Sequence, residues 1–256
     1  MSCREILRLA ILLLLFSPWP LSAWSKQSQV DIAWQAARLA PEDLYRQIVR
    51  HRTAFRDGIV ASIDAADPAR HEKNADGSGA LDVVIASQAA RSIAAIEAHQ
   101  PFRDVVYELG VLLQGVIDAN NPIQTSASDS LEPTYAADFS LYLDSTTSRL
   151  PALFYGLDKR LQGPADLPAF VERTLARSRR LYPFVGREYR RVGGAPGIER
   201  FDDRSTAFGI AAVSFSRALT DSIVVLRYVW LEAGGADSRA LGSLQPDHLI
   251  KLSRSP

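Results

Sequence analysis

Apolar side chains recur every three or four residues along most of the chain, which is the spacing of one face of an α-helix. Between residues 30 and 55 the tripeptide PED at residues 41–43 interrupts this pattern. A proline followed by two acidic residues is typical of the first turn of a new helix, so two consecutive helices are expected here. The apolar positions on this face are Ile32, Ala36, Leu39, Leu44, Ile48 and Phe55.

The same spacing continues after a polar, glycine-containing stretch at residues 68–82, which is predicted to be a loop. A long helical pattern runs over residues 83–118 and is expected to break near His99-Gln100-Pro101. Further helices are expected from Tyr135 to Leu150 and over residues 167–182. Strand patterns are scarce and no linker divides the chain. The sequence therefore predicts one all-α domain, a multi-helix bundle over residues 24–256.

The most apolar segment covers residues 206–235 and ends at a glycine pair, a natural helix stop. Arg217, Asp221 and Arg227 interrupt it. These charges favour a core helix within a bundle over a membrane span, so no transmembrane segment is expected beyond the leader.

The first 23 residues have the pattern of a secretory signal peptide. Arg4 and Arg8 precede or flank the apolar run LAILLLLF, which is too short to cross a bilayer, and small residues follow near Ala23. Cleavage is predicted after Ala23, which makes the protein secreted or periplasmic. The only cysteine, Cys3, lies in this leader, so no disulfide is expected in the processed chain.

The composition excludes a general electrostatic attraction to nucleic acid or anionic membranes, because the formal net charge is +0. One basic tract stands out at residues 173–191. Its arginines Arg177, Arg179 and Arg180 are candidates for binding an anion. The alternative is a solvated arginine face whose members pair with nearby acids.

Candidate metal chemistry lies in two pairs of residues with helical spacing and at the predicted new N-terminus. Gln114 and Asp118 stand four residues apart, as do Asp138 and Tyr142, so each pair shares a helix face. After cleavage, the free amine and the carbonyl of Trp24 could chelate a metal; alternatively, Trp24 simply packs against the protein.

Together these segments resemble the zinc-dependent phospholipase C and single-strand-specific nuclease superfamily, which are secreted all-α phosphodiesterases with three clustered zinc ions. The segment WSKQSQVDIA carries Trp24, Ser28, Ile32 and Ala33 where the family has its N-terminal motif. The segment LGVLLQGVIDANNPIQT matches the helical motif without a gap. Its matching positions are Leu109, Gly110, Asp118 and Pro122.

The departures from the family fall on the metal ligands. By this resemblance three ligand histidines are replaced by Gln29, Gln114 and Gln124, and the bridging aspartate is replaced by Ser62. The later His-x-x-x-Glu pair falls on Asp138 and Tyr142. The positions that keep a ligand-like group are Trp24, His71, Asp118 and Asp138.

A neutral amide oxygen is a poor zinc ligand, so these exchanges predict that the three-zinc site is lost and that no cofactor is bound. The glutamines are expected to hydrogen-bond to the remaining acid, Asp118, inside a closed polar cavity. The leading hypothesis is a non-catalytic protein that binds or scaffolds an unknown ligand or protein of the cell envelope.

The alternative is a metal-dependent phosphodiesterase with a reduced site, acting on a phospholipid or another phosphodiester. Its zinc ligands would be Trp24, His71, Asp118 and Asp138. Asp118 and Tyr142 would carry the catalysis, with Tyr142 contacting the phosphate.

Overall fold

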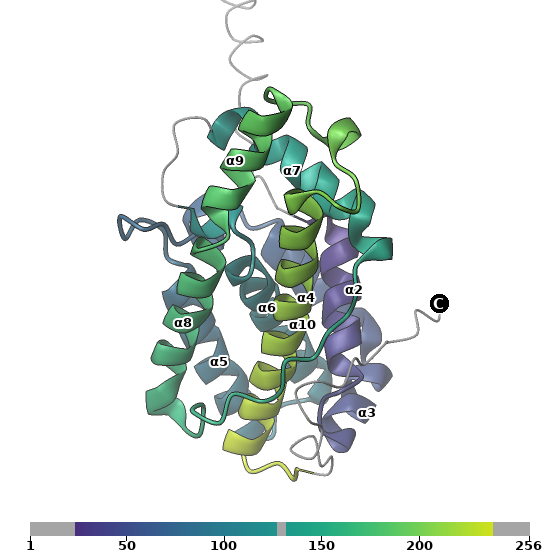
Figure 1. Cartoon of the computed structure of the whole chain (residues 1–256). Helices are drawn as coiled ribbons and strands as arrows, with labels where there is room; N and C mark the ends of the chain where they lie inside the picture. Colours follow the sequence, from purple (N-terminus) through teal and green to yellow (C-terminus); the bar gives the residue numbers. More distant parts are fainter. Residues whose placement is uncertain (1–23, 127–131, 238–256) are drawn as a thin grey trace, which may run out of the picture.

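The computed structural model describes residues 24–126 and 132–237, and every regular element within these ranges is helical (Figure 1). This confirms the predicted all-α class. The predicted leader, residues 1–23 with its cleavage point after Ala23, lies outside the described residues. The α-helices are α2 (Lys26–Ala37), α3 (Glu42–Arg50), α4 (Arg52–Ile63), α5 (Leu81–Glu97), α6 (Phe102–Ala119), α7 (Glu132–Thr146), α8 (Leu167–Arg179), α9 (Tyr182–Val192) and α10 (Thr206–Glu232).

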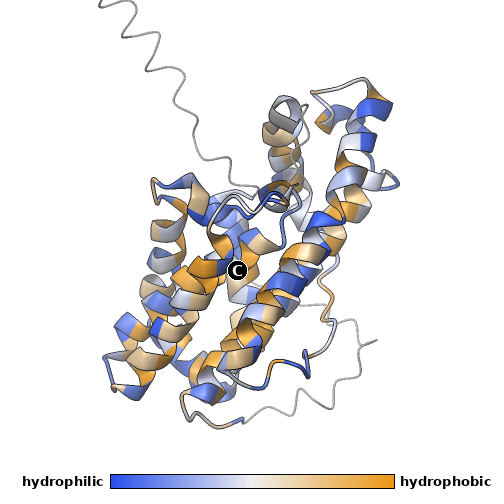
Figure 2. Ribbon diagram, turned by 90° about the vertical axis from the view of Figure 1, so that its left-hand side faces the viewer, coloured by the Kyte–Doolittle hydropathy of each residue, from blue (hydrophilic) through white to orange (hydrophobic). Residues whose placement is uncertain are grey.

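Helices α6 and α10 form the centre of the bundle. Helix α6 packs against α4, α5 and α10, and α10 packs in addition against α2 and α9. Figure 2 shows that hydrophobic residues gather on the helix faces that look into the bundle. Among the described helices, only α10 is long and apolar enough to cross a membrane, and 78% of its most apolar 18-residue window is buried in the bundle.

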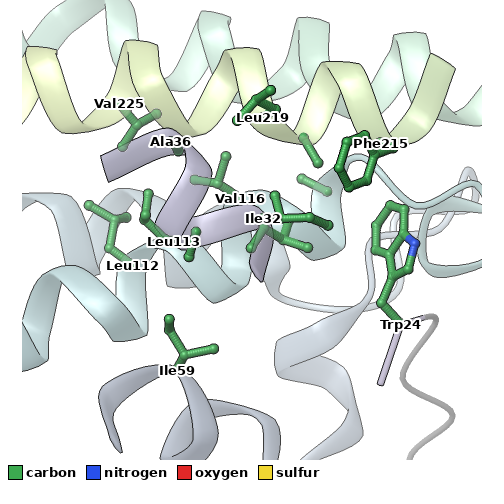
Figure 3. Packing of buried hydrophobic residues seen from close by; sticks show 14 of the residues in the cluster. Trp24, Ile32, Ala36, Ile59, Leu112, Leu113, Val116, Phe215, Leu219 and Val225 are labelled. Carbon is green, nitrogen blue, oxygen red and sulfur yellow. The ribbon is translucent and has the colours of Figure 1, made fainter. Parts of the chain in front are cut away.

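The hydrophobic core extends from α10 to Trp24, the first described residue of the chain. Trp24 is fully buried and lies beside Phe215 of α10, with Ile32 of α2 and Val116 of α6 nearby (Figure 3). Burying an aromatic side chain of this size stabilises the fold by about 2–3 kcal/mol. The start of α2 is therefore anchored to the central helix.

Helices α4 and α6 approach each other so closely that only glycine fits at two crossing positions. A Cβ atom on Gly58 would lie 2.1 Å from the carbonyl oxygen of Tyr107, and one on Gly110 would lie 2.3 Å from that of Phe55. Neither separation is possible for real atoms, so a larger residue at either site would push the two backbones apart.

The helix boundaries agree with the sequence pattern at some points and differ at others. The break between α5 and α6 lies at the predicted place, where His99 adopts a φ of 53° before Pro101. The start of α3 after Pro41 is also confirmed. The pattern missed the break at His51, whose backbone departs from helical geometry with a φ of −112° and a ψ of 33° and separates α3 from α4. It also missed the 3-10 turn at Pro68–His71 within the predicted loop.

The segment between α7 and α8 lies along α10 as an extended strap (Figure 1). The Ser216 hydroxyl donates to the carbonyl oxygen of Pro151 at 2.8 Å. The backbone amide of Tyr155 donates to the Thr220 hydroxyl at 3.0 Å. Hydroxyl groups on one face of α10 thus hold this strap in place.

Candidate functional site

A group of polar side chains is buried where α2, α4 and α6 meet the 3-10 turn at Pro68–His71. Buried polar groups are stable only when they are hydrogen-bonded, so their partners define the site. Each member lies on a different element, except for Gln114 and Asp118, which are one turn apart on α6. The members, with their exposed fractions, are Gln29 (0%), Ser62 (7%), His71 (7%), Gln114 (2%) and Asp118 (1%), and we call them the glutamine network.

Gln114 is the centre of the glutamine network. Its amide oxygen accepts a hydrogen bond from the Ser62 hydroxyl at 2.8 Å. Its amide nitrogen donates to Asp118 Oδ2 and, at 3.4 Å, to Gln29 Oε1. One amide therefore uses its acceptor and both of its donors at once, which fixes the orientation of its side chain.

His71 and Asp118 form a buried pair, with His71 Nδ1 2.8 Å from Asp118 Oδ2. The nitrogens of Gln114 and His71 are 3.4 Å apart because both point at this one carboxylate oxygen. Burial raises the pKa of the Asp118 carboxyl, and the bonds from His71 and Gln114 oppose that rise. Burial alone would lower the pKa of His71, but the bond and charge of Asp118 raise it above its ordinary value.

The network reaches the first described residue through Gln29. The amide nitrogen of Gln29 donates to the carbonyl oxygen of Trp24 at 3.2 Å. A directed chain of bonds therefore runs from Ser62 through Gln114 and Gln29 to the Trp24 carbonyl, and His71 joins it through Asp118. The structure therefore brings together six of the positions that the resemblance assigns to metal ligands: Trp24 and the five members of the glutamine network.

The donor set of this site does not fit a cluster of three zinc ions. Zinc prefers imidazole, thiolate and carboxylate ligands. Within residues 24–126 and 132–237, no group of three or more His, Cys, Asp or Glu side chains could hold a metal ion. The only imidazole and the only carboxylate of the network, His71 and Asp118, are bonded to each other. Asp118 carries one negative charge, whereas three Zn²⁺ ions bring six positive charges.

Two atoms of this pair have no hydrogen-bond partner among the described residues. They are Nε2 of His71 and Oδ1 of Asp118, and both are buried. The backbone of Ala65 also interacts with His71 and makes a small contribution to raising the pKa of its imidazole. Unpaired buried polar atoms are rare in folded proteins, so they mark the part of the network that is open to a further contact.

The structure does not bring Asp138 into the glutamine network. The Asp138 carboxylate accepts hydrogen bonds from the Tyr189 hydroxyl at 2.6 Å and from the backbone amides of Gly197 and Ile198 at 2.8 and 3.2 Å. Burial and this carboxylate raise the pKa of Tyr189 well above its usual range. Asp138 thus holds α7 against the segment that follows α9, and it shares no contact with Asp118.

Tyr142 and Gln124 are two further positions of the resemblance, and both are buried. The Tyr142 ring packs edge-on against Phe201, with centroids 5.1 Å apart, and burial raises the pKa of its hydroxyl. Gln124 is buried in the turn after α6, where its carbonyl oxygen accepts from the Lys73 amide at 2.9 Å. The contacts that Asp138 and Tyr142 make are therefore with other elements than α6, and their grouping with Asp118 stays a prediction.

Of the three candidate anion-binding arginines, two already have partners within the protein. Arg177 forms an ion pair with Asp221. Arg179 donates to the backbone carbonyls of Thr125 at 3.1 Å and Lys73 at 3.2 Å. Arg180 is exposed at the end of α8. The alternative of pairing with a nearby acid therefore holds for Arg177, whereas Arg179 bonds to backbone carbonyls.

A second buried polar cluster was missed by the sequence patterns. Asp221 of α10 is 3% exposed and accepts from Arg177, from Asn120 at 2.9 Å and from Thr174 at 3.4 Å. Burial raises the pKa of this carboxyl against the effect of Arg177. The available signal was a charged pair, Arg217 and Asp221, one turn apart inside the most apolar helix.

No protein-family model matches the chain, and no curated protein is similar enough in sequence to count as a relative.

Proposed function

We propose that this chain is a non-catalytic relative of the zinc-dependent phospholipase C and nuclease superfamily, exported from the cytoplasm to bind or scaffold a component of the cell envelope. One observation carries the proposal. Four residues at the family's ligand positions in the two N-terminal motifs, Trp24, Gln29, Gln114 and Asp118, are joined by buried hydrogen bonds, and Ser62 bonds to Gln114.

The chemistry of the replacements supports this proposal. A glutamine offers two N–H donors and an acceptor, whereas a neutral imidazole offers one of each. In the glutamine network these donors compensate the buried Asp118 carboxylate, which metal ions would compensate in a zinc enzyme. Most polar groups of the site are thus satisfied by each other, which reduces what a zinc ion would add to its stability.

A metal-dependent phosphodiesterase with a reduced site is the second candidate. The unpartnered Nε2 of His71 and Oδ1 of Asp118 favour it, because they are the donors that a single ion would use. The positions of Asp138 and Tyr142 weigh against it, because neither contacts this pair.

Metal analysis and zinc titration by calorimetry test the two candidates on the purified protein. We expect no stoichiometric zinc in the parent. The matched positive control carries Gln29→His, Ser62→Asp and Gln114→His, which place imidazole and carboxylate groups around His71 and Asp118. This variant should bind zinc at least about tenfold more tightly than the parent, which corresponds to about 1.4 kcal/mol.

Stoichiometric zinc in the parent would overturn the proposal. So would hydrolysis of a chromogenic phosphodiester that is lost in Asp118→Ala, and this second result would establish the phosphodiesterase. Export has its own test, because N-terminal sequencing of the protein recovered from the periplasm or medium should begin at Trp24. A chain that stays in the cytoplasm would refute the envelope role without bearing on the zinc chemistry.

A further inference from the structure

The strap between α7 and α8 crosses the C-terminal half of α10, and a groove lies between them (Figure 1). Its volume is about 320 Å³, at the lower end of the range for small-molecule sites. The α10 residues that line it are three, four, seven and eight positions after the first, so they form one face of the helix. The lining residues are Leu157, Asp158, Leu161 and Gln162 of the strap and Val224, Arg227, Tyr228, Leu231 and Glu232 of α10.

The hydroxyl of Tyr228 is a polar group of this groove that lacks a partner. Tyr228 is only 6% exposed, yet nothing within residues 24–126 and 132–237 hydrogen-bonds to its hydroxyl. This oxygen is also not among the polar atoms that the protein encloses completely, so it is open to the groove that the residue lines. A buried tyrosine normally finds a partner for its hydroxyl. The hydroxyl is therefore available to a ligand in the groove.

The carboxylate of Glu232 lies one helical turn after Tyr228 and lines the same groove. It is half-buried and has no hydrogen bond or ion pair within the described part of the chain. Burial raises the pKa of Tyr228 to about 12, and the negative charges of Glu232 and Asp166 contribute to this rise. The hydroxyl thus lies in the field of an uncompensated negative charge, as the shared helix face requires.

The other charged residues that line the groove are already paired. Asp158 forms ion pairs with Arg160 at 2.9 Å and with Arg173 at 3.0 Å. Arg227 forms an ion pair with Asp237, which follows the end of α10. The charge of the groove that is not compensated within the described residues is therefore a carboxylate.

We propose that this groove is a binding site for a small organic amine with an apolar body. The ammonium group donates to the Glu232 carboxylate and to the Tyr228 hydroxyl oxygen. An ammonium carries several N–H donors and no acceptor, so it matches two oxygens that lack partners. The body of the ligand packs against Leu157, Leu161 and Val224. The groove is separate from the glutamine network, so this proposal does not depend on the proposed function.

Ligands of other charge fit this groove less well. An anion would face the Glu232 carboxylate, and it could bind Arg227 only by displacing Asp237. A neutral alcohol of the same shape would leave the half-buried carboxylate without a compensating charge. The charge of the ligand is therefore the property that the experiment must vary while the apolar body stays the same.

Calorimetric titration of the purified protein at pH 7 with hexylammonium tests the proposal. Three related probes separate the contributions: hexanol and hexanoate keep the chain and change the charge, and methylammonium keeps the charge without the chain. Hexylammonium should bind at least about tenfold more tightly than each of the three, because only it uses both ends of the groove.

Variants of the two oxygens test the polar end. Glu232→Gln should weaken hexylammonium binding at least about tenfold, because the ion pair is lost. Tyr228→Phe removes one neutral hydrogen bond and should weaken it roughly three- to tenfold. Glu172→Gln is the matched control, since it removes the same charge from an exposed position of α8 and should leave the affinity unchanged.

The apolar end is tested by Leu161→Ser. It should lower the affinity for hexylammonium toward that for methylammonium and leave the latter unchanged. Circular dichroism melts of each variant establish that it is folded. If Tyr228→Phe does not fold, Glu232→Gln and Leu161→Ser decide the matter.

Three results would overturn the proposal. The first is that hexanol or hexanoate binds as tightly as hexylammonium, since the carboxylate would then not recognise the ligand. The second is an equal loss of affinity in Glu172→Gln and Glu232→Gln, which would indicate unspecific charge attraction. The third is that Leu161→Ser leaves hexylammonium binding unchanged, because the apolar body would then lie elsewhere.

Discussion

Replacing Gln114 by glutamate turns the side-chain NH₂ group at the centre of the glutamine network, a hydrogen-bond donor, into a carboxylate oxygen. In the structure this group donates to Asp118 Oδ2 and Gln29 Oε1, both of which are acceptors. An ionised Glu at this position would face the Asp118 carboxylate at hydrogen-bond distance inside a buried site. Two carboxylates so placed cannot both be charged, so the new side chain must bind a proton.

The free energy of protonating the new glutamate sets an upper limit on the loss of stability. An unperturbed Glu has a pKa of about 4.3, and each pH unit above that value costs about 1.4 kcal/mol for a side chain kept protonated. Gln114→Glu should therefore lower the free energy of unfolding by up to about 4 kcal/mol at pH 7 and by only about 1 kcal/mol at pH 5. The sign follows from the pKa of Glu, which is raised in the folded state. The penalty is thus absent below about pH 4 and grows as the pH rises.

Urea unfolding followed by far-UV circular dichroism, at pH 5, 6 and 7 with a chelator present, measures this dependence. Gln100→Glu is the control, because Gln100 is exposed between α5 and α6 and should change stability by less than about 0.5 kcal/mol. A loss of equal size at pH 5 and pH 7 would refute the reasoning, as would a variant that is as stable as the parent at pH 7. Either result would mean that the side chain at position 114 does not face the Asp118 carboxylate.

Three further variants test other parts of the structure. Ser62→Ala removes the donor to the buried Gln114 oxygen and should cost about 1–3 kcal/mol in the same urea assay. Phe215→Ala leaves a cavity beside Trp24 and should cost about 3–5 kcal/mol, measured as a lower denaturation midpoint at unchanged slope. The hydrogen bonds from two arginines hold the pKa of Asp158 below its usual range, so this group stabilises the fold above about pH 4 and stops doing so as the pH falls through its lowered pKa. Asp158→Asn should therefore cost about 1 kcal/mol at pH 7 and less as the pH falls below about 4, which acid titration of both proteins would show.

Much of the fold could be predicted because helical periodicity and helix-stop signals are local. The break at Pro101 and the start of α3 after Pro41 follow from the geometry of proline alone. The break at His51 has no such local signal, since the residues on both sides continue the apolar spacing. It is the packing of α4 against α6 that turns the chain there.

The candidate site, too, could be predicted only in part. Gln114 and Asp118 were placed together by helical spacing, and Gln29 and Ser62 joined them through a resemblance in sequence. The partners of Asp138 could not be predicted, because they depend on where the segment after α9 lies, and no pattern in the sequence encodes that position. The buried cluster at Asp221 was missed for a related reason, because its partner Arg177 is far away in the chain.

The two glycines between α4 and α6 give the glutamine network its dimensions. Gly58 lies one turn before Ser62, and Gly110 lies one turn before Gln114. The 2.8 Å hydrogen bond between Ser62 and Gln114 therefore depends on the spacing of the two helices, one turn away from their point of closest approach. The side-chain amide protons of Gln114, which belong to the same amide group, would report any widening of the bundle by NMR long before a helix melts.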